Sequence, residues 1–389
     1  MHRLRERVRR LLPDAATFEL GGPARLLPME GLRGVAVGLV FLQHYCMQFL
    51  VLVPLGGPTH VFAVALRNVG NRGVELFFVL SDFLIYSILL RKRPALGPFL
   101  WRRAQRLYPA FLVALAVGAA VDAWRPVAKI PGGIVDAGFY LLANLAFLPG
   151  LLPIPPLFTV NWSLSYEWWF YVACAVLVGT LGLGRFSRRW RVAGILALAA
   201  ATFGLAAAGV ANVPVRGLSL FAGMLLAEAA AAGRKPVPAW AALLGFDLGF
   251  ALCSTPTLPE FGLSAVLAAA FYGVGSAALL GDSVLGRALS WRWLRWFGNM
   301  SYSFYLLHAF VVLASVQAVV RLTGGAAPDA VFWFAMPPVF LAASTAAALL
   351  FCGVERPFSL AYARRPAVPA LDREQGKALT LQSLSKPLA

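Results

Sequence analysis

The chain has 389 residues, of which 60% are hydrophobic and 13% charged, about half the charged share of a soluble domain. One or two soluble cores could not bury this much apolar surface, and such a composition also excludes a disordered chain. A net charge of +17 would suggest a nucleic-acid partner in a soluble protein, but here the basic residues lie in short runs between apolar stretches. We therefore expect a polytopic protein of the lipid bilayer and no nucleic-acid partner.

Ten apolar stretches approach the roughly 20 residues that a membrane-spanning helix needs. They cover residues 34–54, 74–90, 107–124, 161–183, 192–210, 217–232, 239–254, 261–281, 300–320 and 331–353. A further stretch, residues 137–152, is short and interrupted by proline, which favours a re-entrant or interfacial segment. The predicted fold class is all-α, a polytopic transmembrane bundle of about ten spans.

Basic residues divide unequally between the two predicted sides of the membrane. With the N-terminus inside, the inner segments hold 28 of the 34 Lys and Arg residues and the outer loops hold 6, so both termini are expected to be cytoplasmic. We expect a basic cytoplasmic segment at residues 1–28, a membrane domain at residues 29–358 and a disordered cytoplasmic tail at residues 359–389.

Four cysteines lie in or at the end of apolar stretches: Cys46, Cys174, Cys253 and Cys352. They form no CxxC pair, which favours small buried hydrophobic residues over a disulfide framework or a zinc site. We expect no metal site and no permanently bound cofactor.

The segment MEGLRGVAVGLVFLQHY carries Arg33 at the start of the first span and His44 inside it. Eleven residues separate them, close to three turns or about 16 Å, so both side chains share one helix face. An ionisable residue at that depth faces the bundle interior or a cavity. His44 is therefore a candidate general base or, alternatively, an interhelical hydrogen-bonding residue, whereas Arg33 alone is typical of a boundary anchor.

Two carboxylates occur in the second predicted span, within NRGVELFFVLSDFLIYSILLRKR. Glu75 and Asp82 are seven residues apart and share a face, and Asp82 is expected at a depth comparable with that of His44. Such a carboxylate could orient the imidazole of His44, as the third member of a catalytic triad does. Alternatively, Asp82 bonds a neighbouring Ser or backbone group.

A basic segment, RKRPALGPFLWRRAQRLYP, follows this span. Its residues Arg102, Arg103 and Arg106 fall within about 1.5 helical turns. Because Arg binds phosphate bidentately, the cluster predicts a site for a phosphorylated cytoplasmic donor. An ordinary cytoplasmic loop and a lipid-headgroup site are the alternatives.

The fourth predicted span begins with the polar residues Asn161, Ser163, Ser165 and Glu167, which are expected in its outer part. An aromatic belt at the outer interface explains Trp162. It does not explain Glu167, which needs a partner or a cavity.

The ninth predicted span, within FGNMSYSFYLLHAF, carries a polar stripe formed by Ser301, Tyr305 and His308 at spacings of four and three residues. A structural hydrogen-bonding stripe and a catalytic one remain open. Glu355 ends the tenth predicted helix.

In this order, these segments resemble the acyltransferase-3 family of integral membrane acyltransferases over residues 27–358. The matching pieces are LPMEGLRGVAV with the histidine that follows, the ELFFVLS helix, RRAQRLYP, NWSLSYEWWFY, FAGMLLA, SYSFYLLH and GVERP. Family members move an acyl group, usually acetyl, from cytoplasmic acyl-CoA to a hydroxyl of a glycan or small molecule.

The resemblance implies that Arg33 and His44 are tied to activity and that Glu167 matches the family's acidic position after WSLS. The cluster of Arg102, Arg103 and Arg106 matches its basic loop. Two positions depart from the pattern: Glu30 stands where the family usually has Asp, and Asp82 stands where it usually has Gly.

The sequence therefore predicts a multi-pass O-acyltransferase of the bacterial inner membrane, with acyl-CoA as donor and a glycan, lipid-linked sugar or small molecule as acceptor. The expected catalytic residues are His44, Arg33, Glu167 and Asp82, and the expected donor-binding residues are Arg102, Arg103, Arg106 and Glu30. The expected acceptor or cavity residues are Asn161, Trp162, Ser163, Ser165, Tyr305 and His308. The alternatives are a transporter or flippase of a polar lipid-linked sugar with His44 and Asp82 as proton relay, and a family member that binds donor without transfer.

Overall fold

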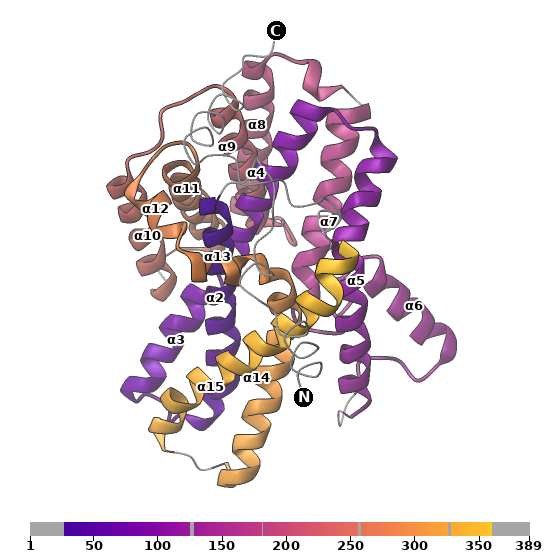
Figure 1. The fold of residues 1–389 in the computed structure, drawn as a ribbon, viewed down its shortest axis with the longest axis vertical. Helices are drawn as coiled ribbons and strands as arrows, with labels where there is room; N and C mark the ends of the chain where they lie inside the picture. Colours follow the sequence, from indigo (N-terminus) through magenta and orange to yellow (C-terminus); the bar gives the residue numbers. More distant parts are fainter. Residues whose placement is uncertain (1–26, 125–127, 181, 256–257, 326–327, 360–389) are drawn as a thin grey trace, which may run out of the picture.

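A computed structural model describes residues 27–124, 128–180, 182–255, 258–325 and 328–359. These residues form helices and loops, with no strand among them beyond an isolated bridge between Pro149 and Leu152 (Figure 1). The all-α prediction is confirmed for this part of the chain. Nearly all of the predicted N-terminal segment and tail lies outside the described residues.

The longer helices are α2 (Leu27–Phe49), α3 (Pro58–Gly70), α4 (Gly73–Lys92), α5 (Leu96–Ala123), α6 (Ile134–Leu145), α7 (Asn161–Ala175), α8 (Arg188–Ala207), α9 (Leu218–Ala231), α10 (Ala239–Ser254), α11 (Glu260–Leu279), α14 (Ser301–Thr323) and α15 (Asp329–Leu350). The short helices α12 (Val284–Leu289) and α13 (Arg292–Asn299) precede α14. Single turns or π-helical extensions are η2 (Leu50–Leu52), η3 (Val176–Thr180), η4 (Leu183–Arg185), η5 (Val215–Gly217) and η6 (Phe351–Ser359).

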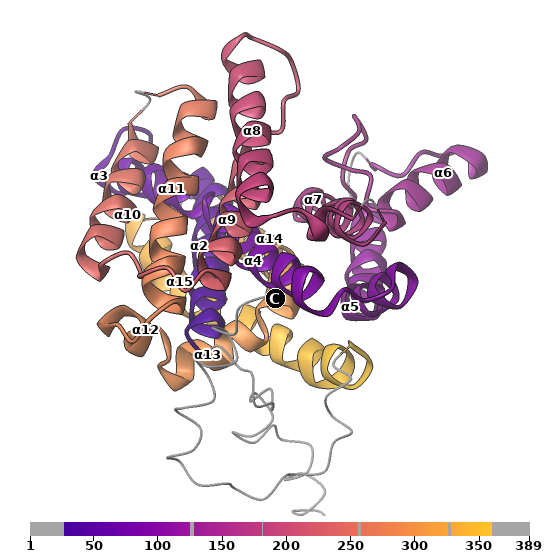
Figure 2. The same cartoon turned by 90° about the horizontal axis from the view of Figure 1, so that it is seen from above.

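Seven helical segments of the described chain are long and apolar enough to cross a membrane. Three of the ten predicted spans correspond to the shorter helices α7, α9 and α10, which have 15, 14 and 16 residues. Each of these is shorter than the roughly 20 residues that cross a bilayer, so length and composition identify seven spans in the described chain, and the count of ten stays a prediction. The short stretch predicted as re-entrant or interfacial overlaps α6, which projects from the side of the bundle in Figures 1 and 2.

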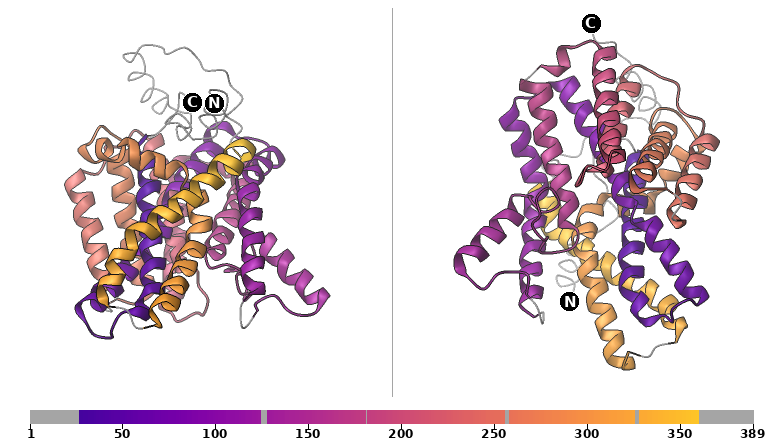
Figure 3. Two further views of the ribbon diagram at one scale, coloured as in Figure 1. Left: turned by 60° about the horizontal axis from the view of Figure 1, so that its bottom comes forward. Right: turned by 180° about the vertical axis from the view of Figure 1, so that it is seen from behind.

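Helix α2 lies at the centre and contacts α3, α4, α13 and α14. Glycines allow this close approach: a Cβ atom on Gly31 would lie 1.8 Å from the backbone oxygen of Leu289, and one on Gly73 would lie 2.5 Å from that of Ala36. Such backbone contact through small residues is the usual means of helix association in membranes. In Figure 3, α14 and α15 run beside each other along the same bundle.

Helices α3 and α4 form one 35-residue apolar segment, Pro58–Lys92, that is broken only at Asn71 and Arg72. This segment begins well before the predicted second span. As a result, Gly73 lies opposite Ala36 and Val40 of α2, and Gly70 lies opposite Leu39 and Gln43. This register decides where the carboxylates of α4 lie.

Candidate active site

A cavity between α2, α4, α5, α7 and α14 gathers most of the predicted charged residues, and we call it the arginine cavity. Its charged lining residues are Arg33, Arg103, Arg106 and Glu167. Three cations therefore face one carboxylate. An excess of positive charge in a partly enclosed space favours an anionic ligand.

Glu355 holds Arg106 at the wall of this cavity. Its buried carboxylate accepts hydrogen bonds from the Arg106 guanidinium and from the backbone and hydroxyl of Ser303. Arg33, in contrast, is half-buried and makes no hydrogen bond or ion pair with the described part of the chain. Within the described residues, Arg33 is thus a cavity cation that no carboxylate contacts directly, although Glu167 lines the same cavity.

Two of the predicted donor-binding residues lie elsewhere. Arg102 is exposed, does not line the cavity, and its Nε atom donates to the backbone oxygen of Pro98 at 3.2 Å. Adjacent helical side chains point about 100° apart, so Arg103 enters the cavity while Arg102 leaves it. Glu30 accepts a hydrogen bond from Arg295 at 3.0 Å and one from Asn299 at 3.3 Å, and so ties α2 to α13.

Glu167 has the partners that its position in the span requires. Ser81 of α4 donates to its Oε1 atom at 2.8 Å, and the hydroxyl of Tyr171, one turn further along α7, donates to the same atom. The carboxylate therefore lies in the arginine cavity, beside the predicted donor-side residues. The expected position of Glu167 in the outer part of the span therefore differs from its place among the cavity arginines.

His44 and His308 form a hydrogen-bonded pair between α2 and α14. The Nδ1 atom of His308 lies 2.9 Å from the Phe304 carbonyl oxygen, and its Nε2 atom lies 3.1 Å from Nδ1 of His44. A carbonyl oxygen only accepts, so in the neutral ring Nδ1 of His308 carries the hydrogen and Nε2 accepts. The Nδ1–H group of His44 then donates to His308 and to Val40, whose oxygen is 3.0 Å away.

This pattern leaves the Nε2 atom of His44 with its lone pair. That atom is buried and has no hydrogen-bond partner in the described structure. His44 lines a second, smaller cavity with Gln48 and Thr159, which we call the histidine pocket. The ring is therefore fixed in the tautomer that a general base requires.

The two cavities follow one another along the same helices. On α14, Tyr302 and Tyr305 line the arginine cavity, and Ala309 lines the histidine pocket. On α2, Arg33 and His44 hold the same order, about 16 Å apart along the axis. Between them, the hydroxyls of Ser163 and Tyr305 lie 2.5 Å apart, and the Tyr305 ring lies 6.0 Å from that of His308.

The expected pairing of Asp82 with His44 is wrong. Asp82 is fully buried, and neither carboxylate oxygen has a hydrogen-bond partner among the described residues. Gly73 of α4 already lies opposite Val40, so Asp82, nine residues further, lies about 13 Å toward the arginine end rather than beside His44. Its Cβ atom instead packs where Gly223 of α9 has no side chain.

The predicted acceptor residues separate into two groups. Ser163 and Tyr305 line the arginine cavity on the side of the histidine pair, to which His308 belongs. Asn161 and Ser165 instead stabilise the start of α7: the Asn161 amide donates to the Asn144 side chain at 2.9 Å, and Ser165 donates to the Asn161 carbonyl. Neither lines a cavity described above, and Trp162 lies under the guanidinium of Arg216 at 5.3 Å.

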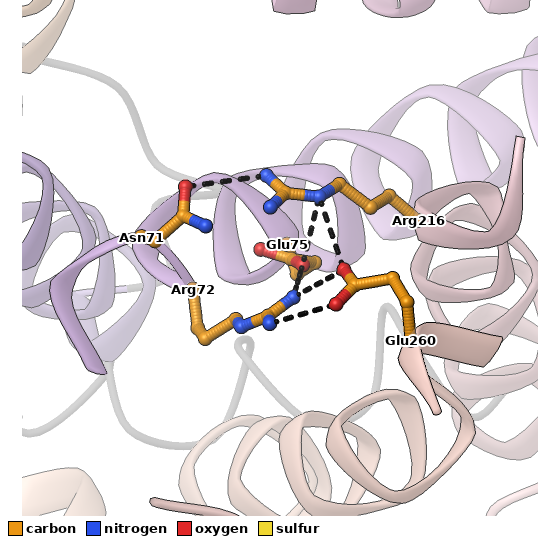
Figure 4. Close-up of polar contacts among 5 residues, drawn as sticks. All are labelled: Asn71, Arg72, Glu75, Arg216 and Glu260. Carbon is orange, nitrogen blue, oxygen red and sulfur yellow. Dashed lines mark hydrogen bonds and ion pairs between the residues drawn. The ribbon is translucent and has the colours of Figure 1, made fainter. Parts of the chain in front are cut away.

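Arg216 belongs to a charged cluster that holds the start of α4 (Figure 4). Arg72 donates to both oxygens of Glu260 at 2.7 and 3.0 Å and to Glu75 at 3.2 Å. Arg216 lies 3.6 Å from each of these carboxylates and donates to Asn71 at 3.4 Å. Two cations balance two anions, so this cluster joins α4 to η5 and α11 with no excess charge.

Sequence reasoning missed several residues of the site. Tyr171 follows Glu167 by one helical turn, and Gln48 follows His44 by one turn, so helical spacing from a known polar residue would have found both. No local pattern indicates that Ser81 contacts Glu167 or that Glu355 contacts Arg106, because each pair joins distant helices. Among the described residues, no group of three or more His, Cys, Asp or Glu is placed to hold a metal ion.

Known proteins share this sequence pattern. The acyltransferase-3 family model, described as an acyltransferase domain, matches residues 28–354. The "Exopolysaccharide production protein ExoZ" of Rhizobium meliloti (strain 1021) is 32% identical over 270 residues, which are 67% of this chain and 82% of that protein. The "Acyltransferase MdmB" of Streptomyces mycarofaciens is 29% identical over 152 residues, 38% of each chain. No solved structure matches.

Proposed function

Because the chain belongs to the acyltransferase-3 family, we propose that it is a membrane O-acyltransferase that uses acyl-CoA, with acetyl as the expected acyl group. The proposed acceptor is a hydroxyl of a glycan, since ExoZ is named for exopolysaccharide production; a lipid-linked sugar or small molecule is the alternative. The proposal retains ten spans, cytoplasmic termini and a bacterial inner membrane, so that the arginine cavity opens to the cytoplasm.

The observation that carries the proposal is the buried Nε2 atom of His44, which has no hydrogen-bond partner among the described residues. In the proposed reaction this atom takes the proton of the acceptor hydroxyl, and the oxygen attacks the thioester carbonyl carbon. The C–S bond then breaks, and the CoA thiolate receives the proton from the imidazolium. General-base catalysis of this kind contributes about 10²–10⁴-fold.

The arginine cavity is the proposed donor site. The phosphates of CoA cannot enter hydrocarbon, and Arg33, Arg103 and Arg106 offer them charge at the predicted cytoplasmic end. The thioester arm then extends along α2 and α14 toward His44. Glu167, held by Ser81 and Tyr171, is proposed to position Arg33 across the cavity rather than to act on the acceptor.

The Ser163 and Tyr305 hydroxyls stand where the donor arm meets the histidine pair. We propose that they donate hydrogen bonds to the oxyanion of the tetrahedral intermediate, because hydroxyl donors fixed before the reaction stabilise developing negative charge. Donor and acceptor thus approach from opposite cavities.

The transporter alternative depends on a proton relay between His44 and Asp82. His44 and Asp82 make no hydrogen bond with each other: His44 contacts His308, and Asp82 packs against Gly223. No observation favours this second function over acyl transfer.

The full chain, purified in nanodiscs with acetyl-CoA and extracted envelope glycans, tests the proposal. His44→Ala should lower acceptor-dependent CoA release by about 100-fold or more while calorimetric binding of acetyl-CoA persists. His60→Ala is the matched control, because His60 lines neither cavity. Substantial transfer by His44→Ala would overturn the mechanism, and no binding of acetyl-CoA by the unchanged protein would overturn the donor assignment.

A further inference from the structure

A third hollow lies between α8, α9 and α11, and we call it the α8 groove. Figure 2 shows α8 at the edge of the bundle beside α9 and α11. The groove contains about 760 Å³ of space, which falls within the range of about 300–1,000 Å³ typical of small-molecule sites. It shares no lining residue with the arginine cavity or the histidine pocket.

The walls of the groove are apolar and long. One face of α8 lines it with Val192, Leu196, Ala199 and Phe203, which extend over about 16 Å. The facing wall, from α9 and α11, combines alanines with larger side chains, namely Ala222, Ala265, Ala268 and Ala269 with Leu218, Phe221, Leu225 and Tyr272. Only Arg191 and Ile195 of α8 are buried, so most of this helix does not pack tightly against the bundle and the groove stays open beside it.

Contacts at both ends hold the groove open. At one end, Arg191 donates to the two oxygens of Glu228 at 2.6 and 2.9 Å, and Tyr86 donates to the same carboxylate at 2.8 Å. At the other end, the rings of Phe203 and Phe261 meet edge to face at 5.1 Å. Because these contacts fix α8 against its neighbours at both ends, the helices themselves keep the groove between them open.

Positive charge gathers at only one end of the groove. Arg188, Arg234 and Lys235 line it there, and Arg234 and Lys235 are exposed. The carboxylate that lines the groove belongs to Glu228, which accepts two hydrogen bonds from Arg191. Arg188 also lies 3.9 Å from this carboxylate, so Arg234 and Lys235 supply the excess positive charge. A long apolar trough with a cationic end matches the chemistry of a phospholipid that carries net negative charge.

We propose that the α8 groove binds one anionic phospholipid of the bilayer, with an acyl chain along the apolar wall and the phosphate at Arg188, Arg234 and Lys235. The lipid is separate from the substrates of the proposed reaction. Helices α4 and α9 lie between the groove and the arginine cavity in contact so close that a Cβ on Gly223 would lie 2.4 Å from the Val79 oxygen.

Native mass spectrometry of the full chain in detergent tests the charged end, with phosphatidylglycerol and phosphatidylcholine of identical acyl chains as probes. We expect phosphatidylglycerol to bind more tightly, and R234Q/K235Q to weaken its binding by about tenfold, since each basic residue near a lipid surface adds attraction. The matched control K92Q/R189Q removes two exposed cations outside the groove and should keep the preference.

The apolar wall has its own test. Ala200 and Ala197 are both exposed on α8, but only Ala200 lines the groove. Ala200→Phe should fill the trough and abolish tight lipid binding, whereas Ala197→Phe should not. Equal binding of the two lipids would overturn the proposal. So would a loss of phosphatidylglycerol binding in K92Q/R189Q or Ala197→Phe equal to that in the groove variants, or displacement of this lipid by inorganic phosphate. Displacement of phosphatidylglycerol by a polyprenyl phosphate at equal concentration would also overturn it, because the occupant would then be a lipid-linked substrate.

Discussion

The Nε2 atom of His308 lies 3.1 Å from Nδ1 of His44, although 264 residues separate them in the chain. His308 is itself oriented by the Phe304 carbonyl oxygen. Because this chain of hydrogen bonds points in one direction, it turns the basic nitrogen of His44 away from its partner. His308 is thus a positioning residue for the proposed base.

Replacing His308 should impair turnover more than donor binding. In His308→Leu, no acceptor remains for the His44 Nδ1–H group except Val40, so the ring loses its fixed orientation, and kcat should fall by about 10–100-fold. His308→Gln retains a side-chain oxygen that accepts this hydrogen and should recover part of the rate. Unchanged KM for acyl-CoA in both variants supports positioning; equal kcat in both variants would refute it.

Arg33→Gln should weaken acyl-CoA binding by about 1.5–3 kcal/mol, the usual contribution of one charge-assisted hydrogen bond. Arg33 suits this test because it makes no hydrogen bond or ion pair within the described residues, whereas removal of Arg106 would leave the buried Glu355 without its cation. Arg102→Gln is the matched control, since its side chain leaves the cavity. Isothermal calorimetry measures the acyl-CoA affinity of both variants. An equal loss of affinity in the two would indicate that the donor phosphates bind at the exposed basic loop instead.

Asp82→Ala should retain acyl transfer, because Asp82 is not a partner of His44. It should also raise the apparent melting temperature, since a buried carboxyl without hydrogen bonds costs about 1–3 kcal/mol. Gly223→Ala, on the facing helix, should lower that temperature because its Cβ would lie 2.4 Å from the Val79 oxygen. A large drop in kcat for Asp82→Ala would restore a functional role for this carboxylate.

Arg72→Ala should destabilise the protein strongly. It leaves Glu75, which is fully buried, without its nearest cation, and breaking a buried pair costs about 3–5 kcal/mol. Glu260→Gln should cost much less, because its side chain is 48% exposed and the amide oxygen still accepts from Arg72. Thermal melting in detergent compares the two, and the reverse order would contradict the cluster's structural role.

Cysteine labelling tests the proposed orientation. Leu55→Cys should react with a membrane-impermeant maleimide from outside intact cells, and Ala95→Cys should react only after the cells are opened, because the basic residues concentrate on the side of Ala95. The unsubstituted protein controls for its native cysteines. Labelling of Ala95→Cys from outside intact cells would contradict the predicted orientation.

The class of the protein follows from the sequence because hydropathy and helical periodicity are local properties. Long apolar stretches require membrane helices, and a spacing of eleven residues puts Arg33 and His44 on one face whatever surrounds them. The family pattern likewise depends only on residues in order. All of these inferences hold before any helix packs on another.

Partners across helices depend on register, which the sequence does not display. The pairing expected between His44 and Asp82 assumed that the two residues lie at a comparable depth. In the structure Gly73 lies opposite Val40, so Asp82, nine residues further along α4, lies about 13 Å toward the arginine end. Tertiary packing alone brought His308 to His44 and Glu355 to Arg106, because hydrogen bonds between distant helices form only when glycine contacts have set their depth and rotation.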